Sequence, residues 1–238
     1  MEKRVILKNG TSKTDLVERI LQCDCCVSDF DYTDVVSPAY TIILSRLLRG
    51  GVFNKEMILW GINCVLENAW KYDYIKEKYW THFNDTFLND DINKKRAESI
   101  IENRKRKLIF PGIKDFYSNF FRDKDTAYIT RCPEYLVKPI SDELSIKQVY
   151  SSAMNKCTCM ENFLLANKKH KRYFLKGDSE VDDQMLFVLN ASKQNGKIED
   201  FVSCHIAKNS KSIDDKYDIN LVGYDYRPLN DFLKKYID

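Results

Sequence analysis

The sequence predicts an α/β fold, a Rossmann-like doubly wound parallel sheet core with an inserted all-helical cap domain. The first observation is that short apolar segments alternate with helical segments of about 10 to 15 residues through 109–238, as in parallel sheets with helical crossovers. The second is that the pattern from Pro38 to Leu108 is helical and contains no convincing strand. An early strand followed by a helical insertion accounts for both.

Each element is expected from its local pattern. Strands are expected where short runs rich in β-branched and aromatic residues occur, and helices where apolar residues recur every three or four positions. The expected strands are 4–7, 25–29, 126–130, 146–152, 171–178, 200–208 and 219–226. The expected helices outside the middle block are 11–22, 110–121, 131–144, 155–169, 181–194 and 227–237, and a further helix at 91–108 closes that block. The predicted domains are a core of 1–37 and 109–238 and a cap of 38–108.

Composition sets limits on the function. The chain has 238 residues, is 44% hydrophobic, and carries a formal net charge of +3 from 38 basic and 35 acidic residues. Such a chain has enough apolar material for a sizeable core, and its near-neutral balance gives no reason to expect nucleic-acid binding. No apolar run approaches the roughly 18 residues of a membrane span, and the N-terminus is too short and charged for a signal peptide. We expect a cytoplasmic protein, a monomer or homodimer, with no membrane or nucleic-acid partner.

Eight cysteines raise the alternatives of a metal site or disulfides. Cys25 and Cys26 lie inside an apolar run, where neighbouring strand residues point to opposite faces and make poor chelate geometry. We therefore expect reduced, mostly buried thiols, with a zinc site as the alternative.

Acidic residues follow two predicted strands directly. Asp29 ends the strand at 25–29, Asp178 lies at the end of 171–178, and Thr130 ends a third strand. Since ligands bind beyond the carboxyl ends of parallel strands, these groups are expected at one edge of the sheet. Gathered carboxylates repel one another unless a cation lies among them, and Mg²⁺ is the hard, oxygen-preferring cation that fits best.

The motifs around these residues resemble those of the haloacid dehalogenase superfamily of phosphohydrolases. The segment DFDYT at 29–33 is similar to the D-x-D-x-T signature, and GDSEVD at 177–182 is similar to the G-D-x-x-x-D motif. Thr130 and Lys156 resemble the lone threonine and lysine motifs of the family by order and spacing. The resemblance covers about 1–37 and 109–238, and the helical insertion looks most like the cap of the phosphoserine phosphatase-like branch.

The resemblance implies a role for each of these residues. Asp29 would attack phosphorus, and Asp31 would protonate the leaving alcohol and then activate water. Thr130 and Lys156 would hold the phosphoryl oxygens. Mg²⁺ would be bound by Asp29, by the backbone carbonyl of Asp31, by Asp178, and by Asp182 directly or through water.

The predicted function is therefore a Mg²⁺-dependent phosphatase, a phosphoric monoester hydrolase that acts on a small phosphorylated metabolite through an aspartyl-phosphate intermediate. A phosphomutase and a non-enzymatic binding protein on the same fold are the alternatives.

Several of these residues also have a purely structural alternative. Asp29 and Asp31 could be turn residues, and Thr130 could simply end a strand. Lys138, Lys147 and Lys176 compete with Lys156 as the phosphate-binding cation. Asp34 is expected to stabilise the loop or hinge, and Asp183 to contribute helix N-terminal charge. The cap would select the substrate, with Arg46 and Arg49 as candidate contacts and its aromatics Trp60, Trp70, Tyr74 and Trp80 expected mainly in the cap core.

Overall fold

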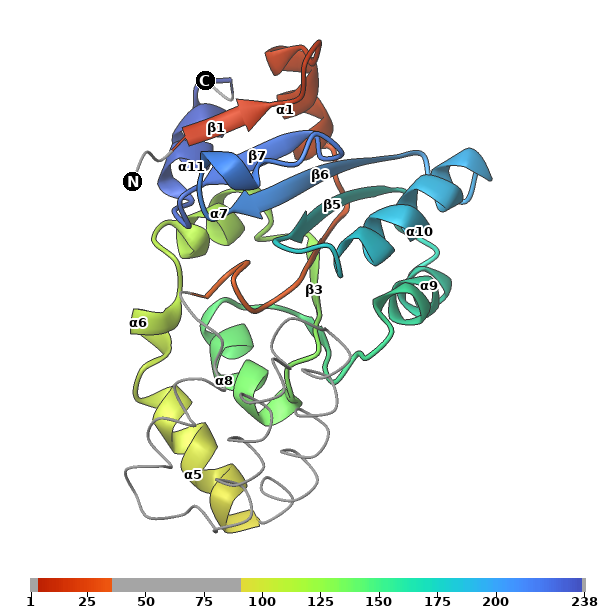
Figure 1. Ribbon diagram of the computed structural model, residues 1–238. Helices are drawn as coiled ribbons and strands as arrows, with labels where there is room; N and C mark the ends of the chain where they lie inside the picture. Colours follow the sequence, from red (N-terminus) through yellow and green to blue (C-terminus); the bar gives the residue numbers. More distant parts are fainter. Residues whose placement is uncertain (1–3, 36–90, 237–238) are drawn as a thin grey trace, which may run out of the picture.

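The computed structural model describes residues 4–35 and 91–236, which form a seven-stranded sheet flanked by helices (Figure 1). The strand order is β1-β7-β6-β5-β2-β3-β4, with β1 antiparallel to β7 and all other pairs parallel. The strands are β1 (Arg4–Leu7), β2 (Cys25–Ser28), β3 (Asp125–Ile129), β4 (Gln148–Tyr150), β5 (Arg172–Gly177), β6 (Asp200–Ala207) and β7 (Ile219–Val222). This confirms the prediction of a mostly parallel, Rossmann-like sheet.

Helices cover both faces of this sheet, as the doubly wound prediction requires. One face packs against α9 (Lys156–Ala166) and α10 (Asp183–Gln194). The other packs against α1 (Lys13–Leu21), α7 (Ile113–Phe120), α8 (Glu134–Glu143) and α11 (Arg227–Lys234). The described chain also contains α5 (Asp91–Glu102), α6 (Lys105–Leu108) and a short 3₁₀ helix at Ser210–Ser212. Each face therefore has its own apolar core.

Strand β2 lies between β5 and β3, and all four of its residues are buried. Its side chains alternate between the two cores, with Val27 in one and Cys26 in the other. Ser28 is in register with Lys176 of β5, and the backbone N–H of the next residue, Asp29, donates to the Lys176 carbonyl at 3.0 Å. The rigid centre of the sheet thus fixes the position of Asp29 at its carboxyl edge.

The segment between β2 and α7 leaves and re-enters the core at adjacent points. Val35 forms an isolated antiparallel bridge with Ile109, and the Phe110 N–H donates to the Asp34 carbonyl at 3.0 Å. Residues 36–90 lie outside the described chain, and with them most of the predicted cap at 38–108, including its arginine and aromatic candidates. The division into core and cap therefore stays a prediction.

The single helix predicted at 91–108 was wrong, because two helices, α5 and α6, occupy this range. Arg104 leaves the helical region with φ −125°, which separates the two helices. The α5 helix packs against α8.

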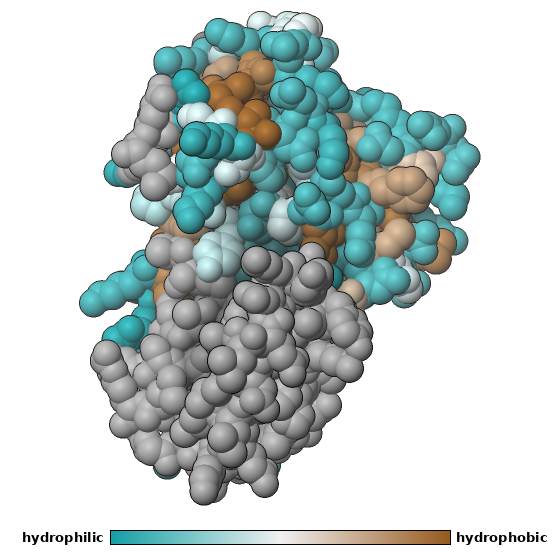
Figure 2. All heavy atoms as spheres, in the orientation of Figure 1, coloured by the Kyte–Doolittle hydropathy of each residue, from teal (hydrophilic) through white to brown (hydrophobic). Residues whose placement is uncertain are grey.

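The cysteines behave as small buried apolar groups in the described chain. Seven free thiols are present there, five of them buried. In the same residues, the group of side chains suited to a metal contains carboxylates and no cysteine, so the zinc alternative finds no support there. Hydrophilic side chains cover most of the described surface seen in Figure 2. None of the described helices has the length and apolar character needed to cross a membrane.

Candidate active site

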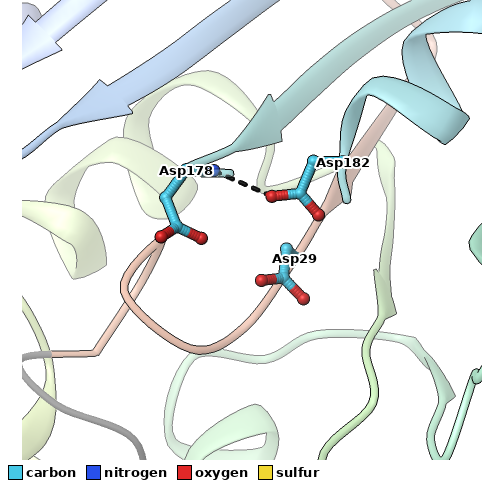
Figure 3. Close-up of side chains that lie close together, drawn as sticks. All are labelled: Asp29, Asp178 and Asp182. Atoms are coloured by element: carbon cyan, nitrogen blue, oxygen red, sulfur yellow. Dashed lines mark hydrogen bonds between the residues drawn. The ribbon is translucent and has the colours of Figure 1, made fainter. Parts of the chain in front are cut away.

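Three aspartates from separate elements converge at the carboxyl edge of the sheet. Asp29 follows β2, Asp178 follows β5, and Asp182 precedes α10; each offers a carboxylate oxygen within 4.8 Å of the others (Figure 3). Asp29 and Asp182 are buried, while Asp178 is half-buried. The structure thus brings together three side chains that the sequence motifs had marked as metal ligands.

Lys156 supplies the positive charge that holds two of these carboxylates. Its Nζ lies 2.6 Å from Asp29 Oδ1 and 2.5 Å from Asp182 Oδ1, and its side chain is 3% exposed. The lysine is the first residue of α9, whose start is capped by Asn155 through a hydrogen bond from the Thr158 N–H. Burial alone lowers the pKa of Lys156, but Asp182 and Asp29 raise it above the usual value, so this cation remains charged at neutral pH.

Asp182 organises the loop that carries Asp178. Its Oδ2 accepts hydrogen bonds from the backbone N–H groups of Asp178 (2.9 Å) and Ser179 (3.1 Å) and from the Ser179 hydroxyl (3.1 Å). Gly177 permits this approach, because a Cβ at that position would lie 2.5 Å from the Asp182 Cβ. Both oxygens of Asp182 are therefore engaged, which makes this residue a scaffold for the site as well as a candidate ligand.

The acidic cluster is electrostatically suited to a cation. Burial, reinforced by the charge of Asp182, raises the pKa of Asp29 to about 6, although Lys156 opposes the shift. Burial together with Asp29 and Asp182 raises the pKa of Asp178 to about 9. A single lysine does not neutralise three carboxylates. The raised pKa keeps a proton on Asp178 at neutral pH, and a hard cation would take the place of this proton. Carboxylate oxygens are the donors that Mg²⁺ prefers, so the residues fit this ion.

The loop after Asp29 curves past Asp178 (Figure 3). Asp31 is half-buried and forms an isolated bridge with Val35. The hydroxyl of Thr33 donates to Asp178 Oδ1 at 3.4 Å and links the loops that follow β2 and β5.

Thr130 follows β3 at the same edge of the sheet and is 1% exposed. Its hydroxyl oxygen accepts a hydrogen bond from the Cys132 N–H at 3.1 Å, and its backbone pairs with Tyr150 and Ala153. These hydrogen bonds hold Thr130 in position within its loop. Its contact with phosphate stays a prediction.

Lys176 and Asp34 form a second, fully buried ion pair beneath the site. Lys176 Nζ lies 2.6 Å from Asp34 Oδ1, and neither side chain is exposed. Three tyrosine hydroxyl groups also donate to the Asp34 carboxylate, those of Tyr117 (2.7 Å), Tyr128 (2.8 Å) and Tyr226 (3.1 Å). The ammonium group lies 4.4 Å from the centre of the Tyr117 ring. Lys176 is therefore occupied in the core, which leaves Lys156 as the cation at Asp29.

This ion pair ties the two loops of the site together from below, since Asp34 is five residues after Asp29 and Lys176 is two before Asp178. The sequence had suggested a loop-stabilising role for Asp34 without its partners. A lysine inside the apolar segment RYFLKG was the available signal, because a charge in a buried strand requires a counter-charge.

The comparisons with known proteins concern the fold. No protein-family model matches the sequence, and no curated protein matches it. Among solved structures, cytosolic 5'-nucleotidase IIIB bound to cytidine is similar at TM-score 0.65 and 14% identity, over 100% of this chain and 94% of that chain. A phospho-aspartyl intermediate analogue of phosphoserine phosphatase is similar at TM-score 0.53 and 14% identity, over 90% and 98% of the two chains.

The fold is shared with these nucleotidase and phosphoserine phosphatase structures. A third similar structure, a phosphoserine phosphohydrolase-like protein from Francisella tularensis, has TM-score 0.52 and 13% identity and covers 87% of this chain and 98% of that chain. Sequence identities this low establish a shared fold alone. The activity of this chain must therefore be argued from its own residues.

Loss of either partner of the Asp34–Lys176 pair should destabilise the protein. Asp34→Asn and Lys176→Met should each lower the free energy of unfolding by about 3 to 5 kcal/mol, because each leaves one buried charge without its counter-charge. The combined Asp34→Leu and Lys176→Met variant should lose less than the sum of the single losses. Urea denaturation measures all three, with Lys197→Met on an exposed lysine as the control. Single variants as stable as the control would contradict the assignment.

The raised pKa of Asp178 should make the metal-free protein less stable as pH rises. The folded state holds a proton that the unfolded chain, with an ordinary pKa of 3.8, has released. This stabilisation is complete below the ordinary value and is lost as pH rises through about 9. Urea midpoints measured in a chelator should fall between pH values of about 6 and 9. Asp178→Asn should flatten the decline and Asp215→Asn, at an exposed site, should not; an equal decline in all three proteins would contradict the account.

Proposed function

We propose that this protein is a Mg²⁺-dependent phosphatase that hydrolyses a small phosphomonoester through an aspartyl-phosphate at Asp29. The observation that carries the proposal is the contact of one buried lysine with both Asp29 and Asp182, beside Asp178. A site of this kind combines a carboxylate nucleophile with positive charge for the phosphoryl oxygens. A binding module has no need of a nucleophile and an adjacent acid at Asp31.

Asp29 is the nucleophile. With a pKa of about 6 its carboxylate is mostly ionised at neutral pH, and the backbone hydrogen bond to Lys176 fixes its position. One carboxylate oxygen bonds to phosphorus while the bond from phosphorus to the ester oxygen breaks, which gives an aspartyl-phosphate and an alcohol. Lys156 has three N–H donors, two of which face carboxylates, and the third remains to offset the charge of the phosphoryl group.

Asp31 is the general acid and base. In the first step its carboxyl group gives a proton to the departing ester oxygen, so that the leaving group is an alcohol rather than an alkoxide. In the second step the resulting carboxylate takes a proton from a water molecule that attacks phosphorus, and Asp29 leaves as a free carboxylate. Asp31 thereby regains its proton, the phosphoryl group leaves as inorganic phosphate, and the enzyme is ready for another cycle.

Asp29, Asp178 and the backbone carbonyl of Asp31 would hold Mg²⁺, with Asp182 shaping the loop around it. The ion, when bound, supplies positive charge that lowers the repulsion between the phosphate oxygens and the attacking carboxylate. Burial, reinforced by the charges of Asp29 and Asp182, raises the pKa of Asp178 to about 9, and this carboxyl group would give up its proton on binding the ion. Thr130 and Lys156 would bind the remaining phosphoryl oxygens.

The comparisons support this proposal through the fold. Structures named for a nucleotidase and for phosphoserine phosphatases share the architecture over most of their length, and one is described as a phospho-aspartyl intermediate analogue. We propose a small phosphorylated metabolite as the substrate on the same grounds.

Release of phosphate from p-nitrophenyl phosphate and from a panel of phosphorylated metabolites tests the function. The protein should be active with Mg²⁺ and inactive in excess EDTA. Asp29→Asn should lower kcat by about a thousandfold or more, because an amide is not a nucleophile toward phosphorus. Asp215→Asn makes the same chemical change at an exposed position and should leave kcat unaltered.

Two outcomes would count against the proposal. Undiminished turnover by Asp29→Asn would reject the aspartyl-phosphate route while leaving a phosphatase. Inactivity of the unaltered protein on the whole panel would reject the phosphatase and favour a binding protein on this fold.

A further inference from the structure

Two tyrosines beside the site have a backbone conformation that side chains rarely adopt. Tyr32, next to Asp31, has φ 55°, and Tyr224, two residues after β7, has φ 54°. Both values lie in the left-handed region, where a bulky residue other than glycine is an outlier. Such outliers persist where the surrounding structure holds them, and they gather at functional sites.

The two rings belong to a stack that begins in the core. Phe110, which is 2% exposed, stacks on Tyr224 with ring centres 5.0 Å apart and planes 18° apart. Tyr224 in turn faces Tyr32 at 6.3 Å and 32°. Tyr32 is 38% exposed, so the row of three rings runs from the interior to an accessible aromatic surface. Anchoring at Phe110 restricts the motion of the outer rings.

The stack lies beside the acidic cluster of the candidate site. Tyr32 stands between the proposed proton donor, Asp31, and Thr33, whose hydroxyl donates to Asp178. Tyr224 follows the carboxyl end of β7, the same sheet edge that carries the aspartates. Burial raises the pKa of Tyr224 to about 12 and that of Tyr32 above its usual value, and Asp178, once ionised, adds to both shifts, which places both phenol groups near this carboxyl group.

Neither phenol hydroxyl of this pair forms a hydrogen bond within the described chain, whereas those of Tyr117, Tyr128 and Tyr226 all bind Asp34. A tyrosine that is exposed and held by ring stacking offers its ring face, and a ring face binds another flat aromatic group. The alternative is that Tyr32 merely covers its loop, in which case it would affect all substrates equally.

We propose that Tyr32, supported by Tyr224 and Phe110, forms a stacking subsite for an aromatic leaving group, which makes nucleoside monophosphates the preferred class of substrate. The inference rests on the proposed phosphatase activity and extends it to substrate choice. The phosphate would lie at Asp29 and Lys156, and the base of the nucleoside would stack on the exposed face of Tyr32. Because stacking is insensitive to the identity of the base, selection among bases is not required of this subsite.

The experiment compares cytidine 5'-monophosphate with ribose 5-phosphate, which share the phosphorylated ribose and differ by the base. The unaltered protein should have a kcat/KM about tenfold or more higher for the nucleotide, the effect of a single stacked base. Tyr32→Ala should lower this ratio about tenfold, mainly through KM for the nucleotide, whereas Tyr32→Phe should preserve it. Tyr236→Ala, at a tyrosine that is 39% exposed and packs on Phe232, is the matched control and should also preserve the ratio.

A second measurement requires no turnover. Titration calorimetry measures the affinity of the full chain for free cytidine. This affinity should fall about tenfold in Tyr32→Ala and be unaltered in Tyr32→Phe. Equal losses of kcat/KM on both substrates in Tyr32→Ala, or no preference for the nucleotide in an active enzyme, would overturn the stacking subsite and leave the phosphatase standing. Binding of cytidine without hydrolysis of any phosphomonoester would overturn the phosphatase and, with it, the assignment of the nucleotide as substrate.

Discussion

The candidate site depends on one buried ammonium group, that of Lys156, which lies between the carboxylates of Asp29 and Asp182. These two residues belong to different parts of the sheet edge, and without a cation between them their charges would repel across a buried space. The lysine also fixes the start of α9 against the start of α10, since Asp182 directly precedes α10. Charge, position and local stability are thus set by the same contact.

Below this contact, the Asp34–Lys176 pair gives the two catalytic loops a common support. The loop after β2 carries Asp29 and Asp31, and the loop after β5 carries Asp178; the buried pair joins the two loops in the core. Removing two charges from water is costly, so such a pair is weak evidence of net stability. The pair instead fixes the two loops relative to each other, because it and its three tyrosine partners form one connected group of contacts in the core.

Much of this fold could be predicted from the sequence, because short apolar runs indicate buried strands and apolar residues at every third or fourth position indicate helices. The carboxylates at 29 and 178 were also predictable, since residues that follow parallel strands meet at one edge, and that at 182 was predicted from its place in the G-D-x-x-x-D motif. The break between α5 and α6 was not, because it arises from the backbone conformation at Arg104, and 91–108 contains no glycine or proline that would mark it. Nor were the partners of Asp34 and the ring stack at Tyr32, which join residues some 80 to 190 positions apart and arise only from packing.

The central claim is that Asp29 becomes covalently phosphorylated during turnover, and acid-quench trapping tests it most directly. The protein is mixed with a phosphomonoester carrying radioactive phosphorus, quenched in acid, digested and mapped. The account predicts a label on the peptide containing Asp29 that hydroxylamine removes, as expected of an acyl phosphate, and a stronger label in Asp31→Asn, which lacks the base for the second step. Turnover with no covalent label in either protein, or a label on a peptide without Asp29, would contradict it.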